Sequence, residues 1–101
     1  MAMPYKINMK IEYDINKSHS NFTKHGVYLD LAEQILQDRN RLDVLDDRFD
    51  YGEIRFIAYA QYQGRIWVCI YTIRSNIYRI ISLRKAHDKE TEKYLTTPRR
   101  F

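Results

Sequence analysis

The feature that most constrains the fold is a run of three strand-like segments in the second half of the chain, at residues 54–62, 65–74 and 77–84. All three are rich in β-branched and aromatic residues, which favour strands. Residues 62–65 form one predicted turn, and Ser75-Asn76 forms a two-residue hairpin turn between the last two segments. Because strands joined by tight turns pair as antiparallel neighbours, we predict a meander within an antiparallel sheet.

The N-terminal part of the chain predicts one more strand and a helix. Residues 6–13 alternate between apolar and polar side chains, which is typical of a half-buried strand. Asp14 or Asn16 can cap the helix that follows, and Gly26 can end it as a C-terminal glycine.

A second helix is expected directly after the first. Asp30 and Glu33 have the spacing of a capping box. The apolar stripe of this helix consists of Leu31, Ala32, Ile35 and Leu36. Residues 38–53 are polar and acidic, and we interpret them as a loop with room for one short strand. Residues 86–95 have helical composition. The predicted fold is therefore α+β, with two N-terminal helices packed on a mainly antiparallel sheet of four or more strands, and a C-terminal helix.

Size and composition restrict the class of protein. The chain has 101 residues, which fits a single domain over residues 1–101 with residues 1–5 as a loose extension. The single cysteine, Cys69, cannot form an internal disulfide, which favours a reducing compartment. Lys6 and Lys10 interrupt the apolar stretch that a secretory signal needs, and no apolar run has the length of a membrane span. We therefore expect a soluble, cytoplasmic protein.

The charge is unevenly distributed along the chain. The formal net charge is +4, but residues 28–53 carry −5 and residues 65–101 carry +6. The simplest interpretation is that two solvated faces happen to differ. The alternative is a basic surface for a polyanion and an acidic surface for a basic protein.

The Ser75-Asn76 turn also predicts which side chains share a face of the sheet. It sets the following cross-strand pairs: Arg74 with Ile77, Thr72 with Arg79, and Ile70 with Ile81. Arg74 and Arg79 then lie together at one end of one face. Because two neighbouring cations are unfavourable without an anion, this pair is a candidate anion site.

The opposite face is expected to combine aromatic rings with a cation. It would carry Trp67, Tyr71, Tyr78 and Arg84. Such a mixture suits nucleic acid, because rings stack on bases and guanidinium groups bind phosphate. It also suits a protein interface, and Trp67 and Tyr71 could instead be ordinary core residues.

The first predicted helix presents polar side chains along one face: Lys17, Asn21, Lys24 and His25. Lys24 and His25 at the helix end interact favourably with the helix dipole, which could be their whole purpose. The alternative is a lysine and a histidine held rigidly beside a basic groove. We expect neither a metal nor a cofactor, because the histidines and Cys69 form no ligand motif and no glycine-rich phosphate loop is present.

Several segments together resemble the BrnT family of type II toxins. The segments are Tyr13-Asp14-Ile15-Asn16-Lys17, Asn21, Lys24-His25-Gly26-Val27, Gly52-Glu53-Ile54-Arg55-Phe56-Ile57, Gly64-Arg65, Thr72-Ile73-Arg74, Arg79-Ile80-Ile81-Ser82-Leu83-Arg84, and Ala86, Glu90 and Tyr94. They follow the family's order and spacing over roughly residues 9–95. One departure concerns Tyr71, which stands where the family often has histidine.

The resemblance implies a RelE-like ribonuclease fold and a toxin that is neutralised by a ribbon-helix-helix, BrnA-like antitoxin. It also implies a hetero-oligomer with that antitoxin, an RNA substrate, and contact with operator DNA only through the antitoxin. The alternative function is a non-catalytic module whose basic face binds nucleic acid or protein.

Metal-independent RNA cleavage needs a base for the 2′-hydroxyl, cations for the charge on the phosphate, and an acid for the leaving oxygen. The candidate catalytic residues are Lys24, His25, Arg74, Arg79, Tyr71 and Glu53. Lys24, His25 or Tyr71 would transfer protons, while Glu53 would act as the base or orient Arg55. The candidate RNA-binding residues are Arg55, Arg65, Trp67 and Arg84.

Overall fold

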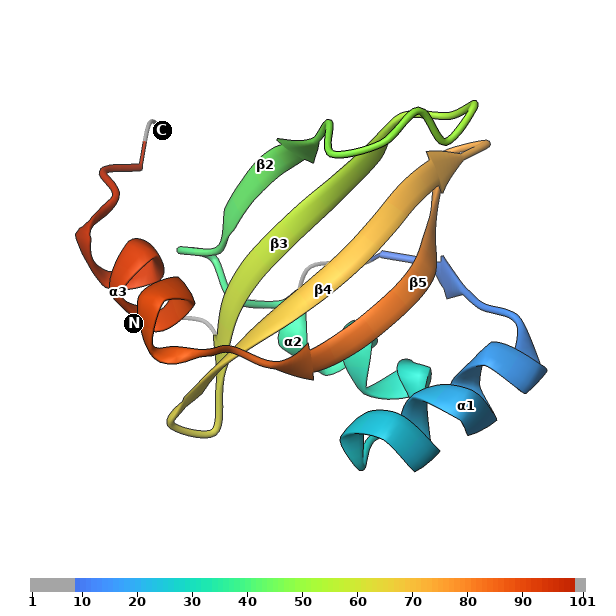
Figure 1. The fold of residues 1–101 in the computed structure, drawn as a ribbon, viewed down its shortest axis with the longest axis horizontal. Coiled ribbons are helices and arrows are strands. Elements are labelled where there is room, and N and C mark those ends of the chain that lie inside the picture. The colour runs from blue at the N-terminus through green and yellow to red at the C-terminus, as the bar shows by residue number, and fades with distance from the viewer. Residues whose placement is uncertain (1–8, 100–101) are drawn as a thin grey trace, which may run out of the picture.

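The computed structural model describes residues 9–99 and shows an α+β fold (Figure 1). One mixed sheet has the strand order β1-β5-β4-β3-β2. Its strands are β1 (Ile11–Glu12), β2 (Leu42–Asp46), β3 (Arg55–Tyr62), β4 (Arg65–Arg74) and β5 (Ile77–Lys85). The α-helices of this part are α1 (Ile15–His25), α2 (Ala32–Ile35) and α3 (Asp88–Thr96), with a 3₁₀ turn at Leu29–Leu31. None of these helices has the length and apolar character needed to cross a membrane.

Both predicted turns are confirmed. Gln63 and Gly64 have φ values of 49° and 74°, and Ser75 and Asn76 have 51° and 65°. Two successive positive φ values are typical of type I′ turns, whose twist matches that of the flanking strands. The expected pairing of Arg74 with Ile77 and of Thr72 with Arg79 is also confirmed.

The predicted register is wrong beyond the middle of β5, because this strand contains a bulge. Tyr71 pairs with Ile80 and Ile70 pairs with Ser82, so Ile81 is an extra residue. An extra residue reverses the side-chain alternation of everything that follows it. Leu83 therefore points into the core, where it is fully buried. Arg84, expected on the face of Trp67, lies on the face of Arg79 instead, together with Ser82.

Local sequence signals account for α1. The Asp14 carboxylate accepts a hydrogen bond from the Lys17 N–H at 3.0 Å, which caps the first turn. Gly26 ends the helix at φ 78°, and its N–H donates to the Phe22 carbonyl.

The second expected helix is much shorter than the sequence suggests. Asp30 lies inside the 3₁₀ turn, Tyr28 is the residue before it, and no side chain caps it, so the expected capping box is absent. The helical part is one turn, α2, whose apolar side chains Ala32 and Ile35 are fully buried. Within the expected strand 6–13, only Ile11–Glu12 pair, in parallel with β5, and residues 6–8 lie outside the described residues.

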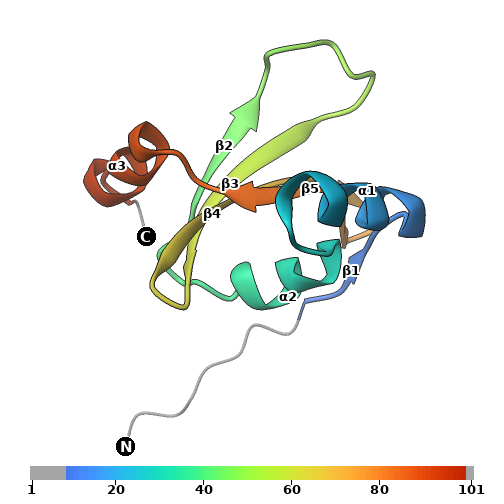
Figure 2. The same ribbon diagram turned by 60° about the horizontal axis from the view of Figure 1, so that its bottom comes forward.

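Two hydrophobic clusters hold the sheet between its helices (Figure 2). On one face, side chains of the 3₁₀ turn and α2 pack against β3, β4 and β5; this cluster includes Leu29, Ile35, Leu36, Ala58, Trp67, Cys69 and Leu83. On the other face, Tyr94 of α3 packs on Tyr59, Ile66 and Val68 near one end of the sheet. The remainder of that second face is where most of the candidate arginines lie.

Candidate functional site between α1 and β5

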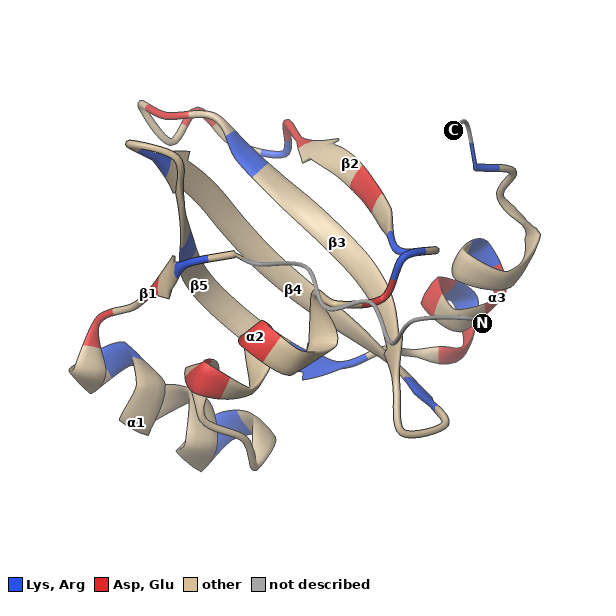
Figure 3. Ribbon diagram, turned by 180° about the vertical axis from the view of Figure 1, so that it is seen from behind, with Lys and Arg blue, Asp and Glu red and all other residues tan. Residues whose placement is uncertain are grey.

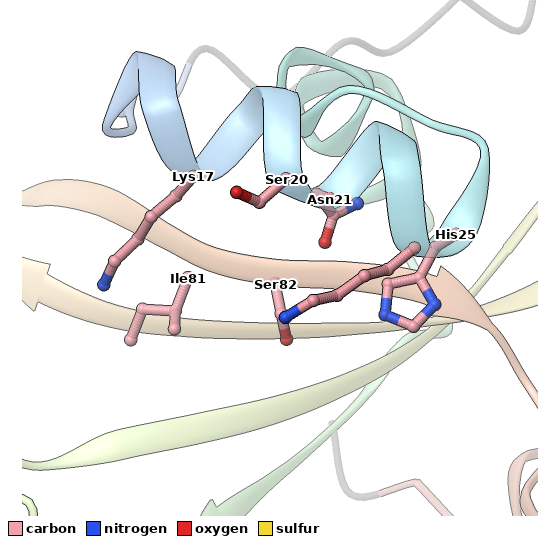
Figure 4. A pocket seen from close by; sticks show the side chains of 7 residues that line it. Lys17, Ser20, Asn21, His25, Ile81 and Ser82 are labelled. Carbon is pink, nitrogen blue, oxygen red and sulfur yellow. The ribbon is translucent and has the colours of Figure 1, made fainter.

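An open pocket of about 310 Å³ lies between α1 and the bulged part of β5 (Figure 4). Its wall on the helix side consists of Lys17, Ser20, Asn21, Lys24 and His25, and its wall on the sheet side consists of Ile81 and Ser82. The pocket brings together Lys24 and His25, the two candidate residues of the first helix. Lys17 and Ser82 join them.

Asn21 fixes the helix to the strand at this point. Its amide nitrogen donates to the carbonyls of Leu83 (2.8 Å) and Val27 (2.9 Å), and its amide oxygen accepts from the Leu83 N–H at 3.1 Å. Asn21 is buried, and these bonds satisfy both polar backbone groups of Leu83. The bulge and this amide together determine which side chains of β5 face α1.

Arg79 belongs to the same face of β5 as Ser82. Its guanidinium lies 3.6 Å from the Glu12 carboxylate on β1. The Lys17 N–H bond lowers the pKa of Asp14, and the positive charges of Lys17 and Arg79 lower it further. Both cations are therefore close enough to the start of α1 to act on one carboxylate.

A second group of charged residues lies at the hairpin end of the sheet. Glu53 accepts from Arg74 at 2.9 Å and from Arg55 at 3.2 Å. These two guanidinium groups, Arg74 first, hold the pKa of Glu53 below its usual range. The Arg55 guanidinium also stacks 4.1 Å above the Tyr51 ring. The carboxylate therefore orients two arginines, and a pKa lowered in this way makes Glu53 a poor general base.

The expected anion site at Arg74 and Arg79 needs a correction. The two residues do share a face of the sheet, as predicted. Each, however, has a carboxylate partner within the protein, Glu53 for Arg74 and Glu12 for Arg79. The repulsion from which we inferred a missing anion is thus already offset by acids that the sequence argument did not pair with these arginines.

Trp67 and Tyr71 do not join the candidate site. Both are buried on the helix-covered face, with exposures of 7% and 5%, opposite to the arginines. The Tyr71 hydroxyl donates to Asp43 at 3.0 Å, and its ring stacks on Phe56. Burial raises the pKa of Tyr71. The interpretation of these two rings as core residues is therefore the one that the structure favours, and neither is positioned to contact RNA bound at the arginines.

Arg84 and Arg65 lie away from the α1 pocket. Arg84 forms a bidentate pair with Glu90 at 2.7 and 2.8 Å, which lowers the pKa of Glu90 to about 2. Arg65 follows the first hairpin turn and lines a separate hollow of about 240 Å³ beside α3. These two candidates are not part of one cluster with Lys24 and His25.

Two carboxylates in the acidic middle of the chain form ion pairs with arginines of the same segment. Asp46, only 4% exposed, pairs with Arg48 at 2.8 Å, and Asp43 pairs with Arg41 at 2.9 Å. Figure 3 shows acidic residues on α2 and on and around β2, while basic residues lie on α1 and on β3, β4 and β5. Because both arginines belong to this segment, these pairs leave the net charge of residues 28–53 at −5.

One further residue of the pocket, Lys17, could have been selected from the sequence. Lys17 precedes Lys24 by seven residues, which places both lysines on the same face of the helix. Ser82 was missed because the bulge was not foreseen. Within residues 9–99, no group of three or more His, Cys, Asp and Glu side chains is arranged to hold a metal ion.

Comparison with known proteins identifies the family. No curated protein matches the chain significantly. The family described as "Ribonuclease toxin, BrnT, of type II toxin-antitoxin system" matches residues 13–90, which include α1, its pocket and strands β2 to β5. Because this match covers most of the chain, the protein belongs to the BrnT family of ribonuclease toxins of type II toxin–antitoxin systems.

Proposed function

We propose that the protein is an endoribonuclease that cleaves RNA without a metal ion at the α1 pocket and thereby inhibits translation and growth. One observation carries this proposal. Among the described residues, no carboxylate lies within ion-pair distance of Lys17, Lys24 or His25, although all three border one pocket. By contrast, Arg41, Arg48, Arg55, Arg74, Arg79 and Arg84 each have an acidic partner. The pocket is therefore a cationic site with its charge available to an anion.

The side chains in the pocket match the needs of cleavage by the 2′-hydroxyl of RNA. Imidazole is the side chain that most readily both accepts and donates a proton near neutral pH, so we assign proton transfer to His25. Lys24 is the second candidate for proton transfer. Lys17 and Lys24 would bind the phosphate and stabilise the charge that develops on it, an effect worth about 2.7–4 kcal/mol for one well-placed donor.

The arginines have supporting roles in this proposal. Arg79 extends the cationic surface along β5 beyond the pocket and can exchange Glu12 for a phosphate, because their contact of 3.6 Å is loose. Arg74 and Arg55, held by Glu53, would contact the RNA backbone further along the same face. Arg65 and Arg84 would contact only the outer parts of a longer RNA.

The same proposal includes the type of fold, the type of antitoxin and the cellular location. The packing of α2 on one face of the sheet, with most of the candidate arginines on the other face, supports a RelE-like arrangement. As a type II toxin the protein has an antitoxin partner, and we propose that this antitoxin is a BrnA-like ribbon-helix-helix protein. The toxin would bind it as a hetero-oligomer, reach operator DNA only through it, and act in the cytoplasm.

The test is cleavage of labelled RNA by the purified protein in excess chelator. We expect products with a 5′-hydroxyl and a 2′,3′-cyclic phosphate, as attack by the 2′-hydroxyl requires. His25→Gln should lower the rate by roughly 10²-fold or more. Lys24→Ala should have an effect of roughly 10²-fold. Lys89→Ala, an equivalent change at an exposed lysine on α3 without an ion pair, is the matched control and should leave the rate unchanged.

Each failure has a distinct meaning. Loss of wild-type cleavage in chelator would refute metal independence. A fully active His25→Gln variant would refute the assignment of proton transfer. Binding of RNA without cleavage would favour the alternative of a non-catalytic module with a basic face.

A further inference from the structure

The two edges of the sheet differ in how far their backbone groups are hydrogen-bonded. At the β5 edge, Ile11 and Glu12 of β1 pair with Tyr78 and Arg79, and the Asn21 amide binds both backbone groups of Leu83. At the opposite edge, β2 is the last strand of the sheet within residues 9–99 and pairs with β3 (Figure 1). Among residues 9–99, no hydrogen bond is made to the outer backbone edge of Leu42–Asp46.

Proteins usually protect an open edge with lysine, proline, a bulge or a covering element, because unpaired backbone groups invite another strand. β2 has the sequence Leu-Asp-Val-Leu-Asp, which contains neither lysine nor proline, and it pairs with β3 without a bulge; its two charged residues are both acidic. Its Leu45 side chain is 57% exposed, and Phe49 in the following loop is 70% exposed. An open edge flanked by apolar side chains is the arrangement that binds an extended segment by strand addition.

The local charge determines which segment fits. Asp47 is exposed, and no described residue pairs with it; Asp43 retains 30% side-chain exposure despite its pair with Arg41. A second copy of the chain would align the acids of one β2 with those of another, and like charges directly opposite one another destabilise a sheet. A segment with lysine or arginine beside its apolar residues avoids this repulsion.

We propose that the outer edge of β2 binds an extended, basic segment of the antitoxin, which adds a strand to the sheet antiparallel or parallel to β2. This inference rests on the antitoxin partner of the proposed function. The α1 pocket adjoins β5, at the other edge of the same sheet. Strand addition at β2 therefore anchors the antitoxin without itself covering the proposed RNA site.

The first experiment is hydrogen exchange on the toxin, free and in the complex purified after co-expression with its cognate antitoxin. We expect amide exchange within residues 42–46 to slow by at least tenfold in the complex. The second experiment compares the affinity of two variants for the same antitoxin. Leu45→Lys places a cation on the open edge and should weaken binding at least tenfold.

Ile15→Lys is the matched control for that variant. Ile15 is 60% exposed, close to the 57% of Leu45, and lies on α1, away from β2. We expect its affinity to stay within twofold of the wild type. Asp47→Lys should weaken binding and make it less sensitive to salt, because it removes an attraction. Thermal melts of the free variants check that all of them fold.

The possible results separate this proposal from its alternatives. Weakening by Ile15→Lys but not by Leu45→Lys would place the antitoxin on α1 and overturn it. Unchanged exchange at residues 42–46 in the complex would do the same. Protection of these amides in concentrated free toxin would show that a second copy occupies the edge. Absence of any complex would refute the antitoxin partner itself, whereas failure of RNA cleavage would leave the binding result standing.

Discussion

Replacing Asn21 by alanine tests whether one buried amide holds α1 on the sheet. The change leaves the Leu83 N–H without an acceptor and removes the donor of two carbonyls. A buried unsatisfied group costs about 1–3 kcal/mol, and each lost hydrogen bond about 1 kcal/mol, so we expect unfolding to become easier by about 3 kcal/mol. For a domain of this size, that corresponds to a loss of about 12–24 °C in Tm.

The measurement is urea and thermal unfolding, with Asn16→Ala as the control. Asn16 is exposed on the same helix, and its replacement should change stability by no more than about 0.5 kcal/mol. RNA cleavage is then measured at a temperature where both variants are folded. We expect it to fall in Asn21→Ala alone, since the pocket depends on how α1 sits against β5. If the two variants have the same stability and activity, the amide is not what positions the helix.

Three further outcomes follow from the structure. Arg48 holds the pKa of Asp46 at about 2, below its usual value, so the pair stabilises the fold at neutral pH and this contribution disappears as the pH falls from about 4 towards 2. Urea unfolding should show Asp46→Asn less stable than wild type at pH 7, with the difference shrinking through that window; a constant difference would contradict the assignment. Burial raises the pKa of the Cys69 thiol to about 12, so iodoacetamide at pH 8 should modify this residue only in denaturant. Rapid labelling of the native protein would show that the core is open. Ser75→Asn combined with Asn76→Gly should stabilise the second hairpin by roughly 0.5–1 kcal/mol, because asparagine and glycine adopt positive φ more readily; a loss of stability in a thermal melt would argue against a type I′ turn.

Much of the architecture was predictable because its signals are local. Asp14 and Gly26 act on backbone groups within a few residues, and they set the ends of α1 correctly. Ser75 and Asn76 form a two-residue turn by themselves, and this turn sets the pairing of Thr72 with Arg79. The family resemblance was also carried by local segments, and the match over residues 13–90 confirms it.

The sequence by itself thus determined the turns, the ends of α1, the three long strands and the family. Only the tertiary structure decided which side chains meet. The bulge at Ile81 places Ser82 at the pocket and Leu83 in the core, and no local signal in the sequence indicated it. The partners of Arg74 and Arg79 come from segments distant in the chain, Glu53 and Glu12. Local preferences extend over only a few residues, whereas ion pairs and strand register depend on groups that the folded chain brings together. For this reason, only the tertiary structure shows that Lys17, Lys24 and His25 on α1 form no ion pair with a carboxylate of the described residues.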